Sequence, residues 1–368
     1  MKRQFARFGA LLLATAALPA LAQDVDPIAS DDPLAAEAAS AGSSPWTFFG
    51  DLLLRLDTVH GLAGRDDVEQ LRSRARFGLQ WTGDGLEFGV AVEGALGSES
   101  NDDVRRNNQN ERNDGGNLDQ LWLRWLPSDN AVLQLGKADL PFAYTPLWWD
   151  ADLRPFGASA SWSTQVGELD RIGLTAGYFA GQHLYEDESR IAAAQFTWRI
   201  REGATTSGDI ALGYVHFDDL EQLVRNGLTR TNRRVGLNLV SDYELVDLQL
   251  GLRHMIGDMP LQARVDLVRN LGADDRRDAG RFSLVLGDSS IPESWEFGYA
   301  VQRIQRDAVM AAFNEDDWWF HSFARGSMPW IAYGFDERWS VRVAGFFERR
   351  DDQPDRVDRL LVDVRARW

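Results

Sequence analysis

The sequence contains no cysteine, few basic residues and, after residue 22, no long apolar run. Without cysteine, neither a disulfide scaffold nor a lipid-modified cysteine anchor can form. Without a run of about 18 apolar residues, a helical membrane protein is excluded. The 39 Lys and Arg against 56 Asp and Glu give a net charge of -17, so nucleic acid is not an expected partner. A membrane protein built from strands stays compatible, because each strand alternates apolar and polar residues.

The N-terminus has the three parts of a secretory signal peptide. Lys2, Arg3 and Arg7 precede an apolar run over residues 9–22, which ends in the small-residue triplet Ala-Leu-Ala. The run is short for a membrane span, which argues against the alternative of an N-terminal anchor helix. We therefore expect residues 1–22 to be a signal peptide that is cleaved after Ala22.

Two further regions follow. Residues 23–45 are rich in Ala, Asp, Ser and Pro and are expected to form a flexible periplasmic lead-in. From Trp46 to Trp368 the chain consists of segments of about ten residues in which apolar and polar side chains alternate. In the last segment Leu360, Val362 and Val364 share a face with Trp368, and a helix would mix these faces. Such segments predict about 16 strands, within a range of 14 to 18.

The connections between these segments alternate in length. Short turns are expected at residues 82–85, 127–130, 166–170 and 335–338, and long loops at 97–117, 137–156, 218–229 and 304–317. A soluble β-sandwich also has turns of mixed length, but strict alternation is typical of bacterial barrels with short periplasmic turns and long external loops. The pattern predicts an all-β fold, a transmembrane antiparallel β-barrel.

Tryptophan is placed in keeping with this prediction. Eight of the 14 tryptophans stand at the short-turn end of an expected strand, on its apolar side. Core aromatics of a soluble sheet would favour strand middles, whereas aromatic residues at strand ends form the girdle at a membrane surface. The expected girdle consists of Trp46, Trp81, Trp125, Trp162, Trp198, Trp295, Trp339 and Trp368.

Six segments carry a resemblance to a known family. They are GDLLLR from Gly50, RSRARFGL from Arg72, DQLWLRW from Asp119, LGKADLPF from Leu135, LWWDADLRPFG from Leu147 and WEFGYAVQRIQRDAVMAAFNEDD from Trp295. On these segments the chain resembles the porin family of Gram-negative bacteria over residues 46–368. The resemblance implies a single-chain outer-membrane barrel through which small hydrophilic solutes and ions diffuse passively.

Charged residues suggest a constriction in such a pore. Three arginines on one strand face would cost up to about 2 to 4 kcal/mol each in lipid, so they are expected to face the lumen. The predicted basic wall consists of Arg72, Arg74, Arg76, Arg124, Arg342 and Arg365. The loop 138–155, expected to fold inward, supplies Asp139, Asp150 and Asp152. The alternative is that the arginines pair with acids such as Asp51 and Asp57 and only satisfy the wall.

Other functions stay open. Trp148 and Trp149 suit a sugar-selective channel and the arginines an anion-selective one, while a structural or adhesive barrel needs no pore. No enzyme motif occurs and the five histidines are scattered, so we expect no enzyme, cofactor or metal. Acidic clusters such as Glu315 to Asp317 are expected to be solvated loop tips, or to reach lipopolysaccharide phosphates through divalent cations.

The expected partners follow from an outer-membrane location. They are outer-membrane lipid and lipopolysaccharide, and the barrel-assembly machinery, which would recognise the C-terminal strand ending in Trp368. A homotrimer is a further expectation, by analogy with porins of this size.

Overall fold

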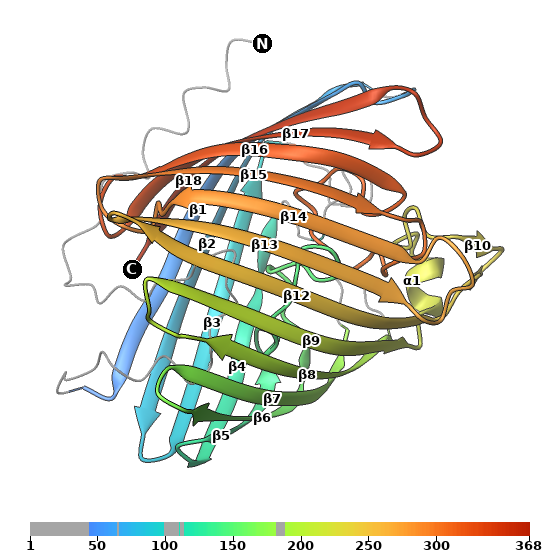
Figure 1. Ribbon diagram of the computed structural model, residues 1–368. Helices are drawn as coiled ribbons and strands as arrows, with labels where there is room; N and C mark the ends of the chain where they lie inside the picture. Colours follow the sequence, from blue (N-terminus) through green and yellow to red (C-terminus); the bar gives the residue numbers. More distant parts are fainter. Residues whose placement is uncertain (1–43, 65, 99–109, 111–113, 182–187) are drawn as a thin grey trace.

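The computed structural model describes residues 44–64, 66–98, 110, 114–181 and 188–368, so the predicted signal peptide and nearly all of the predicted lead-in lie outside it. Sixteen antiparallel strands close into one barrel (Figure 1). Their bounds are β1 Trp46–His60, β2 Val68–Gly83, β3 Leu86–Gly97, β4 Gly115–Ser128, β5 Ala131–Lys137, β6 Phe156–Val166, β7 Asp170–Ala180, β8 Arg190–Ile200, β9 Thr206–Asp218, β12 Tyr243–Ile256, β13 Met259–Asn270, β14 Asp278–Gly287, β15 Ser294–Ile304, β16 Ala324–Gly334, β17 Trp339–Arg350 and β18 Arg356–Arg367.

This architecture confirms the predicted all-β barrel and its strand number. Short turns, such as 84–85 and 257–258, alternate with longer loops, such as 138–155 and 305–323. The loop between β9 and β12 carries a short helix, α1 Glu221–Arg225, and a small hairpin of β10 Arg234–Val235 and β11 Asn238–Leu239. Within the described residues, no helix is both long and apolar enough to cross a bilayer.

The two-residue period of each strand sorts its side chains between the two surfaces of the barrel wall. On β2, Leu71 and Phe77 point outward and are more than half exposed, whereas Arg72 and Arg74 point inward and are only 8% exposed. β2 pairs with β1 in a register that sets Arg76 opposite Asp51. An apolar exterior and a charged interior is the arrangement of a barrel that stands in lipid.

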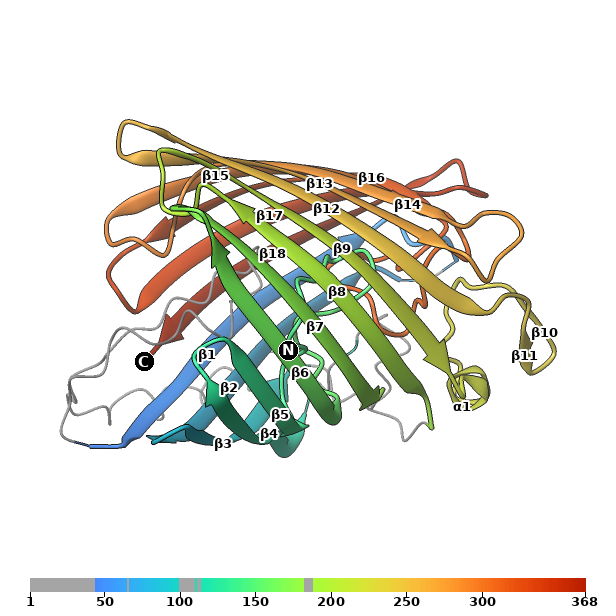
Figure 2. The same cartoon turned by 60° about the horizontal axis from the view of Figure 1, so that its bottom comes forward.

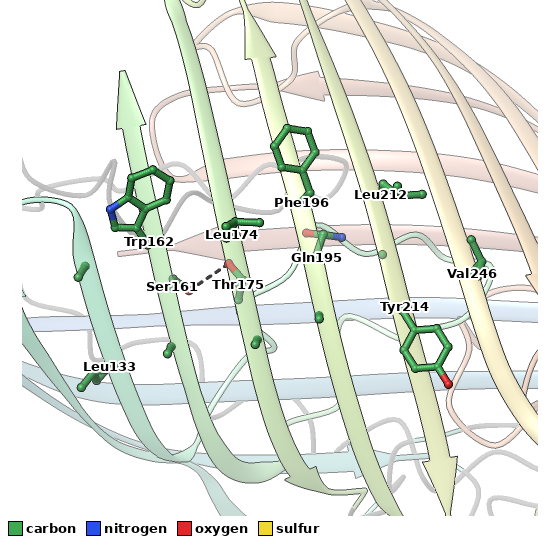
Figure 3. A pocket seen from close by; sticks show the side chains of 15 residues that line it. Leu133, Ser161, Trp162, Leu174, Thr175, Gln195, Phe196, Leu212, Tyr214 and Val246 are labelled. Carbon is green, nitrogen blue, oxygen red and sulfur yellow. Dashed lines mark hydrogen bonds between the residues drawn. The ribbon is translucent and has the colours of Figure 1, made fainter. Parts of the chain in front are cut away.

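The exterior is uneven on the sector formed by β5 to β9. Alanines at positions 160, 176 and 194 leave a shallow hollow, which larger apolar side chains surround. Figure 3 shows Trp162, Leu174, Phe196 and Tyr214 around this hollow, each on a different strand. The hollow belongs to the outer surface, so it is separate from the lumen.

Two long loops turn into the barrel. We name residues 138–155 the third loop and residues 305–323 the seventh loop, by their order among the longer connections. Coil segments of both cross the space between the strands in Figure 2. Their apolar side chains pack against inward-facing residues of β7, β8, β9 and β12 in one buried cluster. Phe313 is stacked between Trp149, at a centroid distance of 5.8 Å, and Phe217, at 5.4 Å.

Burial explains why these loops fold inward. The third loop contains Leu140, Phe142, Leu147 and Leu153, each at most 6% exposed. Leaving such a side chain in water costs about 1.5 to 3 kcal/mol. The inward faces of the neighbouring strands offer matching apolar surface, including Ile191. The loop is therefore held inside the barrel by the same effect that forms a protein core.

Candidate functional site

The third loop crosses the barrel from one wall to the opposite wall. At one end, the amide of Ala143 donates to Gln195 Oε1 at 2.8 Å, and Gln249 Nε2 donates to the Ala143 carbonyl at 2.7 Å. At the other end, Asp152 Oδ1 lies 2.7 Å from Arg74 Nη1. Gln249 is on β12 and Arg74 on β2, and these strands are eight places apart in the ring of 16. The loop thus divides the lumen.

The contact of Asp152 with β2 joins the two sets of residues expected from the sequence. Arg76 Nη1 lies 3.8 Å from the same carboxylate oxygen. Both arginines also contact Asp51 on β1, Arg76 at 2.5 Å and Arg74 at 3.6 Å. The alternative expectation, that the arginines pair with acids of the barrel wall, therefore holds for Asp51. These pairs exist in addition to the contact of the arginines with the third loop. Asp57, in contrast, pairs with Arg359 at 2.7 Å.

Two other predicted wall residues, Arg342 and Arg72, face the seventh loop. Arg342 Nη1 lies 3.8 Å from Asp317 Oδ2, and Arg365 Nη2 lies 3.4 Å from Asp363 Oδ2 on its own strand. The side chains of Arg342 and Arg365 are 24% and 28% exposed although they point into the barrel. Arg72 is buried, and its positive charge acts on Asp316.

Three predicted residues lie elsewhere. Arg124 stands on β4 with its Nε 2.6 Å from Gln134 Oε1, away from the Asp152 contact. Asp139 pairs within the third loop, with Arg154 Nη1 at 2.9 Å. Asp150 is 1% exposed, and its amide donates to the carbonyl of Phe313 at 2.7 Å, which ties the third loop to the seventh.

The seventh loop was not assigned to the constriction from the sequence. Arg55 on β1 reaches Asp317 at 2.6 Å. Arg359 on β18 donates to the carbonyls of Asp316 and Asp317, each at 2.7 Å. Glu348 on β17 accepts hydrogen bonds from the amides of residues 319 and 320. The sequence feature that could have indicated an inward fold is the apolar run of residues 308–313 before Glu315 to Asp317, because such a run is unusual in a solvated loop.

Two interpretations of the sequence are wrong. Trp148 and Trp149 are 1% and 2% exposed within the apolar cluster, so they cannot stack against a sugar in the lumen. Asp316 is 6% exposed inside the barrel and does not form a solvated loop tip. In both cases apolar neighbours draw the loop inward, and an alternation pattern cannot reveal this.

Three carboxylates meet where the two loops touch. The ligand oxygens of Asp150, Glu315 and Asp316 all lie within 4.8 Å of one another, and carboxylate oxygens are the ligands that Ca²⁺ takes. Burial, followed by the charges of Asp317 and Asp316, raises the pKa of Glu315 to about 8. Burial and the charge of Glu315 raise the pKa of Asp150 well above its usual value. Glu315 is therefore mostly protonated at neutral pH.

Hydrogen bonds from Asn110 also relieve the repulsion in this cluster. The Asn110 amide donates to Asp316 at 2.6 Å, and its side chain donates to Asp150 at 2.8 Å. Each donor stabilises the charged form of the carboxylate that accepts it. The contact between the loops is thus held by polar as well as apolar interactions.

The eight tryptophans expected at one edge of the barrel all lie there on outward positions, six next to short turns and Trp46 and Trp368 at the two ends of the barrel. Trp46 and Trp81 are register partners on β1 and β2. Trp125 and Trp295 are each 52% exposed. Trp81 and Trp368 are half-buried and the other six are exposed. Indoles at one level on the outside of a barrel are compatible with the boundary between lipid hydrocarbon and water.

The comparisons with known proteins establish the fold of this chain. No protein-family model and no curated protein matches the sequence. Solved structures match over nearly the whole barrel. OprB of Pseudomonas putida has a TM-score of 0.57 at 12% identity and covers 88% of this chain and 94% of its own. OmpF of Salmonella typhi, in complex with daunomycin, has a TM-score of 0.56 at 12% identity, covering 88% and 98%.

A third match is an anion-selective porin from Comamonas acidovorans, with a TM-score of 0.53 at 15% identity, covering 89% of this chain and all of its own. The chain therefore has the fold of the 16-stranded outer-membrane porins of Gram-negative bacteria. At these identities the likeness establishes the fold, and the solute has to be argued from the lumen of this chain.

Proposed function

We propose that this protein is an outer-membrane channel for passive diffusion of small hydrophilic solutes and ions, with a constriction beside the contact of the third loop with the arginines of β2. The observation that carries the proposal is the contact of Asp152 with Arg74, at the point where the third loop reaches the wall. Charged side chains at the edge of a narrow passage set the preference for permeating ions.

Exposure inside the barrel supports an aqueous passage. Asp152, Arg342 and Arg365 point inward, yet 36%, 24% and 28% of their side chains are exposed. Charged groups on the inside of a closed barrel stay ionised at low cost where water reaches them or where an opposite charge pairs with them. The largest apolar cluster lies against β7 to β15, and two smaller ones, around Trp318 and Trp319, cover part of β1, β2 and β16 to β18. The passage is therefore expected between these clusters, beside the exposed Arg342 and Arg365.

The alternatives are a solute-selective channel and a structural or adhesive barrel without transport. The anion-selective match and the arginines on the wall are compatible with anion preference. The acids of both loops offset that charge, which favours a general channel. The proposal includes export by a cleaved signal peptide, contact with lipopolysaccharide and homotrimer formation.

The absence of cysteine makes a direct test available. In R365C the new thiol would face the proposed passage, whereas V364C places it on the lipid side of the same strand. In planar bilayers, a charged thiol-reactive reagent should lower the conductance of R365C and leave V364C and the unmodified chain unchanged. A swelling assay with sugars of increasing size would give the size limit. A folded barrel without conductance would support the structural alternative.

A further inference from the structure

Four arginines form a row on the outside of the barrel. They are Arg303 on β15, Arg325 on β16, Arg349 on β17 and Arg356 on β18. Arg303 is paired in register with Arg325, Arg325 with Arg349, and Arg349 with Arg356. All four side chains are exposed. We name these four residues the arginine row; the strands that carry it are neighbours in Figure 1.

The four positive charges of the arginine row repel one another. Neighbouring strands lie about 4.8 Å apart, and like charges directly opposite each other destabilise a sheet. Arg303 has Asp351 at 3.5 Å, and Arg356 has Asp358 at 2.6 Å. Neither Arg325 nor Arg349 has a hydrogen bond or ion pair within the described part of the chain. In a protein of net charge -17, this concentration of positive charge is a local exception.

Other strands do not repeat the pattern. At the same edge of the barrel, Arg269 on β13 pairs with Asp278 on β14 at 2.6 Å, and Glu244 is the outward residue near the start of β12. Charges of both signs thus alternate there. Only on β15 to β18, among the described strands, do four outward positions in register all carry a guanidinium group.

The height of the row places it at a membrane boundary. From Trp295 to Arg303 and from Trp339 to Arg349, the strands advance by roughly 27 and 34 Å. With a strand tilt of 35 to 45°, this corresponds to roughly 20 to 28 Å across the membrane, against an apolar band of about 25 Å. The arginine row therefore lies at the edge of the lipid band opposite the tryptophans, on the side of the long loops.

Apolar side chains lie beneath part of the row. At the next outward positions toward the middle of the band, Val301 and Phe347 are more than a third exposed, whereas Ser327 on β16 and Asp358 on β18 are polar. Leu360, also more than a third exposed, follows one outward position further along β18. The Arg356 guanidinium lies over the Phe347 ring, 5.1 Å from its centroid. A ligand that fits this surface has negative groups at the level of the arginines and hydrocarbon chains directly below them.

Building on the outer-membrane location in the proposed function, we propose that the arginine row binds the phosphate groups of a diphosphorylated lipid of the outer leaflet, with the acyl chains of that lipid against Val301 and Phe347. Guanidinium groups bind phosphate through paired, charge-assisted hydrogen bonds. Two phosphates at opposite ends of one headgroup would neutralise arginines on different strands. The lipid would thereby relieve the repulsion within the row and hold β15 to β18 together.

The test is lipid binding by purified, folded barrel in detergent. R325Q/R349Q removes the two arginines without partners, and R190Q/R269Q is the matched control, because it removes two outward charges at the same edge elsewhere. Diphosphoryl lipid A, monophosphoryl lipid A and inorganic phosphate serve as probes in native mass spectrometry. We expect R325Q/R349Q to bind diphosphoryl lipid A at least tenfold more weakly, and the control to lose less than twofold.

Several outcomes would overturn the proposal. Equal losses in the two double variants would mean that overall charge, and not the row, attracts the lipid. Displacement of the lipid by equimolar inorganic phosphate would assign the site to free phosphate. A change in oligomeric state with unchanged lipid binding would assign the row to contact with a second copy of the chain. If R325Q/R349Q does not accumulate as folded barrel, the single variant R325Q carries the same test with the same expected direction.

Discussion

Replacing Asp152 by Asn tests how the constriction selects ions. Its carboxylate lies 2.7 Å from Arg74 Nη1 and 3.8 Å from Arg76 Nη1, and its side chain is 36% exposed. The change keeps the volume of the side chain and removes one negative charge. The two arginines keep theirs, so the potential at the constriction becomes more positive and favours anions.

The size of the effect follows from Coulomb's law. Removing the charge of Asp152 changes the electrostatic energy of an ion that passes in water at about 6 Å by about 0.4 kcal/mol at 0.1 M salt. Cations and anions respond with opposite sign, so the ratio of their permeabilities changes about fourfold. For a channel without initial preference, the reversal potential in a tenfold gradient of potassium chloride then shifts by about 25 mV.

The measurement is the reversal potential of single channels in planar bilayers. D278N is the matched control, because Asp278 is exposed on the outward side of β14, beside Arg269. The shift should decrease at 1 M salt, where screening shortens the range of the charge. R74A should shift the reversal potential in the opposite direction. If D152N and D278N behave alike, the ion-selecting part of the lumen lies elsewhere.

Three shorter predictions concern other parts of the chain. Raising the pH from 6 to 9 should shift selectivity toward cations, because Glu315, with its pKa raised to about 8, then loses its proton; in E315Q this shift should be smaller. W368D should reduce the yield of heat-modifiable barrel, because it removes the indole that contacts the Phe77 ring at a centroid distance of 5.4 Å, and with it roughly 2 kcal/mol of aromatic and interfacial stabilisation. N-terminal sequencing of protein extracted from membranes should begin at Gln23, and an intact Met1 would refute the predicted cleavage.

The alternation of residues was sufficient to predict the barrel and the side of the wall on which a residue lies. On β2, Arg72, Arg74 and Arg76 alternate with Leu71 and Phe77. Because successive side chains of a strand point to opposite faces, the apolar side chains can face lipid only if the arginines point into the barrel. The turn lengths and the strand-end tryptophans then oriented the strands. These are local signals, because each depends on neighbouring residues along one segment.

Loop contacts could not be predicted in the same way. The three acids of the third loop are equivalent by composition, yet Asp152 contacts Arg74, Asp139 pairs with Arg154, and Asp150 is buried. Which acid faces the wall depends on where the apolar side chains of the loop find surface to bury. That surface comes from strands distant in sequence, so it exists only once the barrel has closed.

The sequence by itself therefore determined the class of fold, the inward and outward faces and the ends of the strands, because periodicity acts over a few residues. Only the tertiary structure decided which residues meet. The seventh loop reaches Arg55 on β1 because β1 and β18 join at the seam of the barrel. Arg303, Arg325 and Arg349 form one row because of the register of β15 to β17, which depends on hydrogen bonds between strands and is not encoded within any one of them.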